Sequence, residues 1–449
     1  MTAIFYTLGV VAFVLAILVS IGLHELGHMI PAKRFGGKVT QYFIGFGPTV
    51  WSKRVGETEY GVKAIPLGGY VKIVGMLPPG AVELADSVEV DADGNRVVRV
   101  RKSNTGLFTQ LISDARAAEW ETIGPEDESR LFYKLPWWQK VIVMAGGPTV
   151  NIAIALAIFA PVFATYGNPS DLKVSLTVEN VAPCVVPAAE DARACRADDP
   201  ATPAALAGLR KGDQFLAFNG EPVSTWGELS KLIRDNDDGA ATLTILRDGE
   251  QLTVDTNTTV AARPSTEGAE DLVQVGFLGV TPAVDRVTGG LGYTLGQMGQ
   301  MTVDTVQAFA ELPAKVWGVG RAIVGLQERE LDSPVSIVGG GRFAGETVSH
   351  DDFPVKEKAV FLLMLIAGFN FFIGMFNFLP LLPLDGGHIA GALWEAVRRG
   401  WARLRGRPDP GYVDVARLLP VAYVVGLSLL VMGVVLIVGD LVVPLHIPE

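Results

Sequence analysis

The sequence contains few cysteines, few histidines and no excess of positive charge. Two cysteines among 449 residues exclude a disulfide-rich scaffold and a multi-cysteine zinc module. A net charge of -11 argues against a nucleic-acid-binding protein, because neutralising phosphates requires a basic face. Charged residues make up only 19% of the chain and hydrophobic residues 49%, which excludes a disordered chain and a coiled coil. Histidine chemistry has five candidates: His24, His28, His350, His388 and His446.

Four long apolar blocks stand out from the rest of the chain. They cover residues 1–30, 137–166, 357–384 and 417–445, and each is long enough for the roughly 20-residue helix that crosses a bilayer. The first block lacks a basic start and a small-residue cleavage site, so we interpret it as a retained span and not as a signal peptide. The sequence therefore predicts a polytopic α-helical membrane protein with four transmembrane helices.

Lysine and arginine residues predict the orientation of these spans. They are concentrated in two loops, residues 31–136 and residues 385–416, whereas the segment 167–356 is acidic. Because the cytoplasmic loops of membrane proteins carry an excess of basic residues, we expect both basic loops in the cytoplasm. Both termini and the acidic segment are then extracytoplasmic.

The first basic loop contains three kinds of sequence. Glycine-punctuated, alternating residues at about 57–76 predict a β-hairpin or small sheet. Residues 77–104 are polar, and we interpret them as an insert. Residues 106–122 carry apolar side chains at helical spacing, which is typical of either a small core face or a membrane-surface helix, and both interpretations stay open.

The extracytoplasmic segment is predicted to hold a small α+β domain and a connector. Residues 167–289 alternate short strands with short helices, and a Gly-Leu-x-x-Gly-Asp turn ends at Asp213. This order of elements resembles a circularly permuted PDZ domain of the bacterial kind, which binds extended peptides at a sheet edge. Residues 290–356 have helical stretches. Cys184 and Cys195 both fall on the oxidising side, where we expect a disulfide between them; two unpaired thiols are the alternative.

A cluster of polar residues interrupts the end of the first span. His24 and His28 are four residues apart, so both imidazoles project from one helix face and can share a metal ion. Glu25 stands beside them and is suited to take a proton from a metal-bound water. Polar side chains inside a bilayer are costly and are functional by default. The cluster therefore predicts a metal-dependent active site.

Catalytic zinc usually takes three protein ligands, so the third ligand should come from another span. The third span should end on the cytoplasmic side, level with the two histidines, and Asp385 is the acidic residue at that end. Prolines before it break the helix, which is tolerated where the freed backbone lines a protein cavity. We expect Asp385 as the third ligand, and His388 is the competing candidate. A mixed histidine and carboxylate site with an open position favours zinc.

Two motifs together resemble a known family. The histidine–glutamate motif of the first span and the segment Asn377-Phe-Leu-Pro380-Leu-Leu-Pro-Leu-Asp385-Gly of the third span resemble the site-2 proteases, a family of intramembrane zinc metalloproteases. The likeness is closest to the bacterial branch with four spans and an outer PDZ module. It implies that one zinc ion per chain is held by the two histidines and Asp385, and that Glu25 is the general base.

The same resemblance implies contacts with substrate. Asn377 matches an asparagine that holds substrate backbone near the metal, and its amide could equally support a developing oxyanion. Pro380 belongs to the same motif. Gly68, Gly69 and Tyr70 lie in the β element, which resembles the family's membrane-associated β element and is expected to offer a sheet edge to an unwound substrate. Strand addition would replace the backbone hydrogen bonds that a transmembrane helix loses when it is extended.

The expected function is that of a zinc-dependent endopeptidase in the bacterial cytoplasmic membrane. By resemblance, its partners are single-span membrane proteins such as anti-sigma factors, trimmed first by an upstream extracytoplasmic protease and then cut near the cytoplasmic side of the bilayer. Remnant signal peptides form a second substrate class, and the PDZ module acts as a size filter or as a dock for the trimmed tail. Two alternatives are a membrane metal transporter and a non-catalytic PDZ membrane scaffold, although an intact Glu25 disfavours the scaffold.

Overall fold

The structure consists of two compact units. The first combines Met1–Pro161 with Leu291–Glu449, and the second is Val162–Gly290. Much of the predicted polar insert lies outside the described residues. This computed structural model describes residues 2–78, 88–90, 96–98, 107–120, 123–186, 194–264, 272–351 and 353–445.

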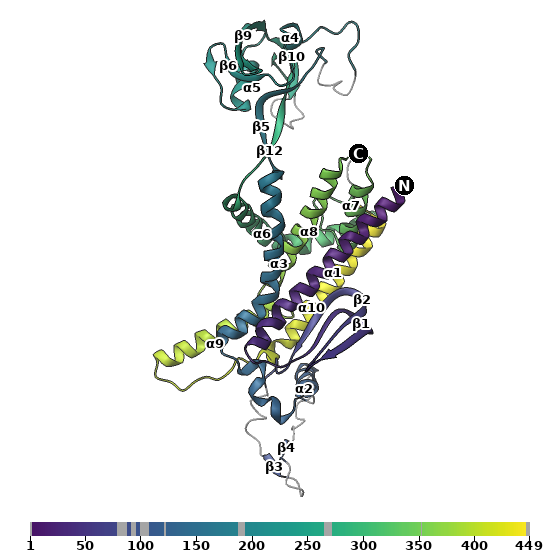
Figure 1. Cartoon of the computed structure of the whole chain (residues 1–449), viewed down its shortest axis with the longest axis vertical. Helices are drawn as coiled ribbons and strands as arrows, with labels where there is room; N and C mark the ends of the chain where they lie inside the picture. Colours follow the sequence, from purple (N-terminus) through teal and green to yellow (C-terminus); the bar gives the residue numbers. More distant parts are fainter. Residues whose placement is uncertain are drawn as a thin grey trace. The chain divides into compact units, whose positions relative to one another are not determined.

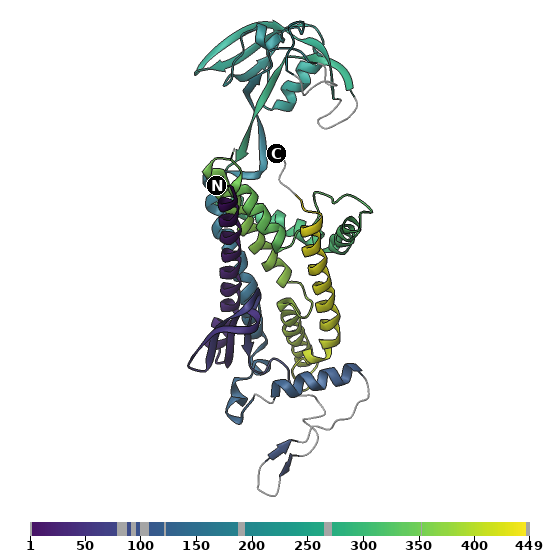
Figure 2. The same ribbon diagram turned by 90° about the vertical axis from the view of Figure 1, so that its right-hand side faces the viewer.

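Within the described residues, four helices are long and apolar enough to cross a membrane. They are α1 (Thr2–Arg34), α3 (Trp137–Thr165), α8 (Val355–Asn377) and α10 (Leu419–Val442), the last preceded by the 3-10 turn η4 (Val415–Leu418) (Figures 1 and 2). They overlap the four apolar blocks, which confirms the prediction of a polytopic membrane protein. At most 33% of any of these apolar stretches is buried, as expected for helices whose outer faces meet lipid tails.

The helices α1 and α3 pack backbone to backbone near the polar motif of the first span. A side chain at Gly27 would collide with the carbonyl of Gly146, and a side chain at Gly146 would collide with the carbonyl of Gly27. Small residues allow two membrane helices to approach this closely. The contact places α3 directly against the histidine-bearing turn of α1.

A bent β element follows α1. β1 (Val39–Val55) and β2 (Thr58–Ile73) are antiparallel, and their register shifts repeatedly. Gly45, Gly47 and Gly68 have positive φ angles, a backbone conformation that costs glycine little, and they lie at breaks in the pairing of the two strands. Figure 2 shows this sheet alongside the lower part of α1.

Of the hairpin and the small sheet predicted at about 57–76, the structure has a small sheet, which also includes residues 39–55. The first arm of β1 (residues 39–44) lies between two arms of β2 (residues 59–62 and 69–73). Tyr42 is opposite Tyr60 in one arm of β2 and opposite Val71 in the other. Alternation of side chains predicts a strand but does not specify which strand it pairs with. As a result, residues 69–73 form an edge of the sheet.

The other described residues of the first loop form short elements. β3 (Val88–Val90) pairs with β4 (Arg96–Val98). Helix α2 (Leu107–Trp120) occupies the stretch with apolar residues at helical spacing. Two 3-10 turns, η1 (Pro125–Arg130) and η2 (Phe132–Lys134), then lead into α3.

Two further helices precede α8. They are α6 (Leu291–Ile323) and α7 (Ile337–Ser349), and both lie in the segment in which the sequence indicated helical stretches. α7 packs against α1 through its glycines: a Cβ at Gly340 would lie 2.9 Å from the ring of Phe13. The glycine-rich sequence of α7 therefore serves close helix packing.

The third span ends earlier than residue 384, where the sequence placed its end. α8 ends at Asn377, and the turn at 378–384 leads into a further helix, α9 (Asp385–Leu404). Pro380 and Pro383 lie in this turn, and proline interrupts the backbone hydrogen bonding of a helix. The segment expected as a loop at 385–416 thus contains a 20-residue helix, which Figure 1 shows extending away from the other helices of its unit.

The second unit is an α+β domain whose elements follow the order read from the sequence. Its six-stranded sheet has the order β12-β5-β6-β8-β9, with β7 beside β6. Helix α5 (Trp226–Asp235) packs on a core that includes Phe215 and Leu243, and a disulfide joins Cys184 to Cys195. The other elements are β5 (Asn168–Val181), α4 (Pro203–Leu206), β6 (Gln214–Phe218), β7 (Glu221–Pro222), β8 (Ala240–Arg247), β9 (Glu250–Asn257), β10 (Thr259–Pro264), β11 (Leu272–Phe277) and β12 (Val280–Val287).

Candidate active site

Three side chains from distant parts of the sequence converge at one point of the first unit. α1 carries His24 and His28, and Asp385 is the first residue of α9. The Nε2 atoms of the two histidines lie 3.4 and 3.3 Å from Oδ2 of Asp385 and 3.2 Å from each other. The structure thus brings together the three residues that the sequence named as candidate ligands.

Two hydrogen-bond acceptors orient the histidine rings. Nδ1 of His24 lies 2.6 Å from Oδ1 of Asn151, and Nδ1 of His28 lies 2.8 Å from the carbonyl oxygen of Val143. Because both partners accept, each Nδ1 carries a proton and donates it. The unprotonated Nε2 atoms therefore face Asp385, as in metal-binding histidines whose second ring nitrogen is held by an outer partner.

A second asparagine fixes the orientation of the Asn151 amide. Nδ2 of Asn151 donates to Oδ1 of Asn370 at 3.0 Å. Nδ2 of Asn370 in turn donates to the carbonyl oxygen of Ile366 at 2.9 Å and to Oγ of Ser20 at 3.0 Å. A carbonyl oxygen can only accept, so Ile366 determines which end of each amide faces the next residue.

The sequence alone did not reveal this network. Asn151, Asn370 and Ser20 are all buried, and each lies in an apolar span. A polar residue inside a bilayer is a functional candidate by default, and that was the available signal. Its partners became identifiable only when three helices were placed side by side.

The three converging atoms fit a cation. Two imidazole lone pairs and a carboxylate oxygen repel one another at these distances unless positive charge lies between them. Oδ2 of Asp385 is buried and accepts no hydrogen bond from the described residues. Gly147 of α3 leaves space beside them, since a Cβ there would overlap Nε2 of His28 and lie 2.7 Å from Nε2 of His24. A donor set of two nitrogens and one oxygen is typical of catalytic zinc.

A cavity of about 400 Å³ opens beside this cluster. His24, Glu25 and Asn377 line it, together with Gly68 and Gly69 of β2. A Cβ at Gly69 would lie 3.0 Å from Cγ of Glu25, so the absence of a side chain lets the edge of the sheet approach the carboxylate. The cavity thus adjoins the candidate metal ligands, the candidate base and a strand edge.

The remaining residues expected to contact substrate have different surroundings. Nδ2 of Asn377 donates to the carbonyl oxygen of Ile373, one turn earlier in α8, at 3.1 Å. Tyr70 stacks on Phe43, with ring centroids 5.6 Å apart. Pro380 is exposed in the turn after α8. Neither Tyr70 nor Pro380 is among the described residues that line the cavity.

His388 lies in a separate environment. It lines a small pocket with Lys140 and Glu395, whose side chains form a buried ion pair at 2.8 Å between α3 and α9. Among the described residues, the cluster of potential metal ligands contains Asp385 and not His388. The geometry therefore favours Asp385 as the third candidate ligand.

Comparison with known proteins points in the same direction. The family described as peptidase family M50 matches residues 12–409. Zinc metalloprotease Rip1 of Mycobacterium tuberculosis is 34% identical over 452 residues, covering 98% of this chain and 99% of that protein. Rip1 of Mycolicibacterium smegmatis is 32% identical over 454 residues with the same coverage. Zinc metalloprotease RasP of Geobacillus kaustophilus is 28% identical over 430 residues, covering 87% of this chain and 90% of that protein.

Proposed function

The chain belongs to peptidase family M50, the site-2 proteases, and is an intramembrane zinc metalloprotease; within it, we propose that His24, His28 and Asp385 hold one zinc ion and that Glu25 is the general base. The observation that carries this assignment is the convergence of two unprotonated Nε2 atoms and one carboxylate oxygen. Their hydrogen bonds to Asn151 and to the Val143 carbonyl support it, because they hold both rings in the metal-binding tautomer.

Each residue of the cavity has a separate proposed role in peptide hydrolysis. When bound, zinc would polarise the scissile carbonyl and make a water molecule acidic enough to lose a proton near neutral pH. Glu25 takes the proton from the attacking water and delivers it to the leaving amine. Asn377 lines the same cavity, and its amide supports the substrate carbonyl oxygen after exchanging its present bond to Ile373. The prearranged rings of His24 and His28 need no reorientation during the reaction.

We propose that the sheet edge at 69–73 presents the substrate. A transmembrane helix hides its peptide bonds in its own hydrogen bonds, so it must be extended before water can attack. The edge strand offers backbone groups to such an extended segment. Gly68 and Gly69 support this role, because they line the cavity and bring the strand next to Glu25.

The proposed orientation places both basic loops, and with them the active site, on the cytoplasmic side of a bacterial cytoplasmic membrane. The termini and the second unit are then extracytoplasmic. This proposal rests on the concentration of lysine and arginine in 31–136 and 385–416. A disulfide between Cys184 and Cys195 is consistent with it, because disulfides persist in oxidising compartments.

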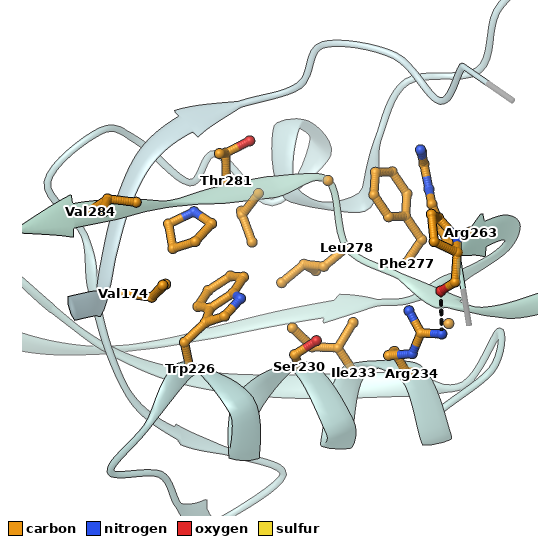
Figure 3. Close-up of a pocket in the computed structure, with 15 residues that line it drawn as sticks. Val174, Trp226, Ser230, Ile233, Arg234, Arg263, Phe277, Leu278, Thr281 and Val284 are labelled. Carbon is orange, nitrogen blue, oxygen red and sulfur yellow. Dashed lines mark hydrogen bonds between the residues drawn. The ribbon is translucent and has the colours of Figure 1, made fainter. Parts of the chain in front are cut away.

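The second unit is proposed to be a PDZ domain that docks the trimmed outer tail of a substrate. A groove of about 480 Å³ runs between β12 and α5, with Trp226 and Ile233 on the helix and Thr281 and Val284 on the strand (Figure 3). β12 is the end strand of its sheet, so an extended peptide can add to it. The largely apolar lining favours docking of a tail over a role as a size filter that only excludes bulky outer domains.

The proposed substrates are single-span membrane proteins of the anti-sigma factor type, with remnant signal peptides as a second class. An upstream extracytoplasmic protease would act first and leave the short outer tail that the groove accepts. Cleavage near the cytoplasmic face would then release a cytoplasmic regulator.

Cleavage of a model transmembrane substrate by the protein in reconstituted vesicles tests the catalytic assignment. Glu25→Gln should abolish cleavage and retain zinc, whereas Asp385→Asn should lose both. Asp304→Asn changes an exposed carboxylate on α6 and serves as the matched control. Full activity of either active-site variant would overturn the assignment, and zinc flux without proteolysis would indicate a transporter.

A separate comparison tests tail docking. Val284→Glu puts a charge in the groove at a residue that is 53% exposed, so it should not disturb the core. Val260→Glu makes the same change on β10, outside the groove, and is the control. We expect only Val284→Glu to slow cleavage of a substrate with an apolar outer tail, while a tailless substrate is cut equally by both. Equal rates with the tailed substrate would contradict docking in this groove.

A further inference from the structure

The helix α9 has an apolar face that points away from the protein. Five large side chains on it are 45–85% exposed. At 3.6 residues per turn they fall within an arc of about 100°, which is the width of the apolar stripe of an amphipathic helix. These residues are Leu393, Trp394, Val397, Trp401 and Leu404.

The opposite face of α9 is anchored to the rest of the unit. Glu395 is 1% exposed, and its carboxylate lies 2.8 Å from Nζ of Lys140 on α3. Ala392 and Ala402 are buried on the same side of the helix. Because this anchor fixes the rotation of α9 about its axis, the apolar stripe is held outward.

Arginines border the stripe along one edge. Arg405 and Arg398 fall within about 40° of that edge of the arc, and Arg403 is about 80° beyond the other edge. The guanidinium of Arg405 lies 4.3 Å from the ring centroid of Trp401, so charge and aromatic surface are presented together. Arg403, Arg405 and Arg407 are all exposed.

The chain on either side of α9 determines its level relative to a bilayer. Seven residues (378–384) separate α8 from α9, and 14 residues (405–418) separate α9 from α10. Both neighbours are helices suited to cross a membrane, so α9 cannot move far from the bilayer surface. Apolar surface with tryptophans, bordered by arginines, is typical of helices that lie in the headgroup region of anionic membranes.

We propose that α9 is a lipid-binding helix that rests in the bilayer interface, with its tryptophans and leucines among the acyl chains and Arg403, Arg405 and Arg407 on anionic headgroups. The charge complementarity selects an anionic lipid surface over a neutral one. Because Asp385 is the first residue of α9, the lipid-bound helix also carries the third candidate metal ligand.

A single fluorescent label can test this contact. Both cysteines of the chain are in a disulfide, so Val397→Cys provides one reactive thiol on the apolar stripe. Gln251→Cys, on an exposed strand of the second unit, is the matched control. The full chain is reconstituted in phosphatidylcholine vesicles with or without about one-third phosphatidylglycerol. The readouts are the emission wavelength of the probe and its quenching by aqueous iodide.

We expect the probe at residue 397 to shift to the blue in the anionic vesicles, with an iodide quenching constant lowered about threefold and recovering in high salt. The probe at residue 251 should not respond. Replacing Arg403, Arg405 and Arg407 together by Gln should remove the effect of the anionic lipid. Replacing Lys173, Arg210 and Lys231 by Gln gives the same change in net charge and should leave the effect intact.

Three results would overturn the proposal. In the first, iodide quenches the probe at residue 397 equally well in neutral and in anionic vesicles. In the second, the probe is protected in neutral vesicles, or in the triple arginine variant, as strongly as in the protein with all its arginines in anionic vesicles. Protection that grows with protein density in the bilayer, at constant lipid composition, would assign the surface to a second copy of the chain. The measurement needs no proteolysis and can be made in the Glu25→Gln variant, so it stands apart from the proposed catalytic assignment.

Discussion

Nδ1 of His24 lies 2.6 Å from Oδ1 of Asn151, which links the first transmembrane helix to the second at the candidate zinc site. Asn370 of α8 donates to Ile366 and accepts from Asn151, so three helices contribute to the tautomer of one ring. Because Asn151 and Asn370 orient the His24 ring, the packing of these three helices affects metal binding.

Removing this partner should weaken zinc binding. We expect Asn151→Leu to lower zinc affinity or activity by about 10- to 100-fold, the usual effect of losing an outer partner of a histidine ligand. Asn151→Asp keeps an acceptor opposite His24 and should retain most of the affinity. The measurement is competition for zinc with a chelator, together with kcat and KM for cleavage.

Asn370→Leu should have a weaker effect of the same kind, because Asn151 then loses the partner that fixes its amide. Ser428→Ala on α10 removes an exposed hydroxyl bound to its own helix and is the control. Unchanged zinc affinity in Asn151→Leu would contradict a positioning role for this network.

A methyl group at Gly147 should exclude zinc. The Cβ of Gly147→Ala would overlap Nε2 of His28 and lie 2.7 Å from Nε2 of His24, in the space where the metal is expected. Gly368→Ala, in the interior of α8, has no atom within 4 Å of its added Cβ and is the matched control. Zinc content measured by atomic spectroscopy should fall to background in the first variant and stay at wild-type level in the second. A folded Gly147→Ala protein with a full complement of zinc would exclude this position for the metal.

The ion pair between Lys38 and Asp127 should make stability depend on pH. Nζ of Lys38 lies 2.7 Å from both carboxylate oxygens of Asp127, and this hydrogen bond holds the pKa of Asp127 below its usual value of about 3.9. A lowered pKa in the folded state contributes stability above the unfolded pKa, and this contribution is lost as the pH falls through the folded value.

Asp127→Asn should therefore destabilise the protein at pH 7, by about 2 kcal/mol for a hydrogen bond between charged groups. The difference from wild type should shrink once the pH falls below about 4. Thermal unfolding in detergent at several pH values measures it. Glu128→Gln alters an adjacent, exposed carboxylate and should have little effect at any pH. A difference that does not change with pH would mean that the charge of Asp127 does not matter.

A buried ion pair at the other end of the spans should hold α7 in place. Asp440 of α10 accepts from Arg329 at 2.8 Å and from the backbone N–H groups of Ser336 and Gly339 at 2.7 and 3.1 Å. Ile337, the first residue of α7, lines the active-site cavity. Breaking a buried pair leaves an uncompensated charge and costs about 3–5 kcal/mol.

Asp440→Asn should accordingly lower the unfolding temperature, expose the segment before α7 to protease and reduce cleavage, while the zinc content is unchanged. Glu330→Gln, an exposed change in the same segment, should match wild type in all three measurements. Loss of zinc in Asp440→Asn would instead indicate that this pair supports the metal ligands themselves.

The sequence by itself determined the number of spans and the candidate metal ligands. A bilayer demands about 20 apolar residues per helix, so spans are visible in one dimension. The spacing of His24 and His28 is fixed by helix geometry, and Asp385 stood out as an acidic residue at the end of an apolar block. These features depend on local pattern and on the cost of polar groups in lipid.

Only the tertiary structure decided how distant segments meet. The first arm of β1 lies between the two arms of β2. Hydrogen bonds link His24 through Asn151 to Asn370, and these residues are separated by long stretches of chain. The sequence did not predict helix α9, because arginines separate its apolar residues along the chain and the segment resembles a basic loop. Local pattern fixes which residues can form a helix, a strand or a ligand pair, whereas their partners are selected by packing in three dimensions.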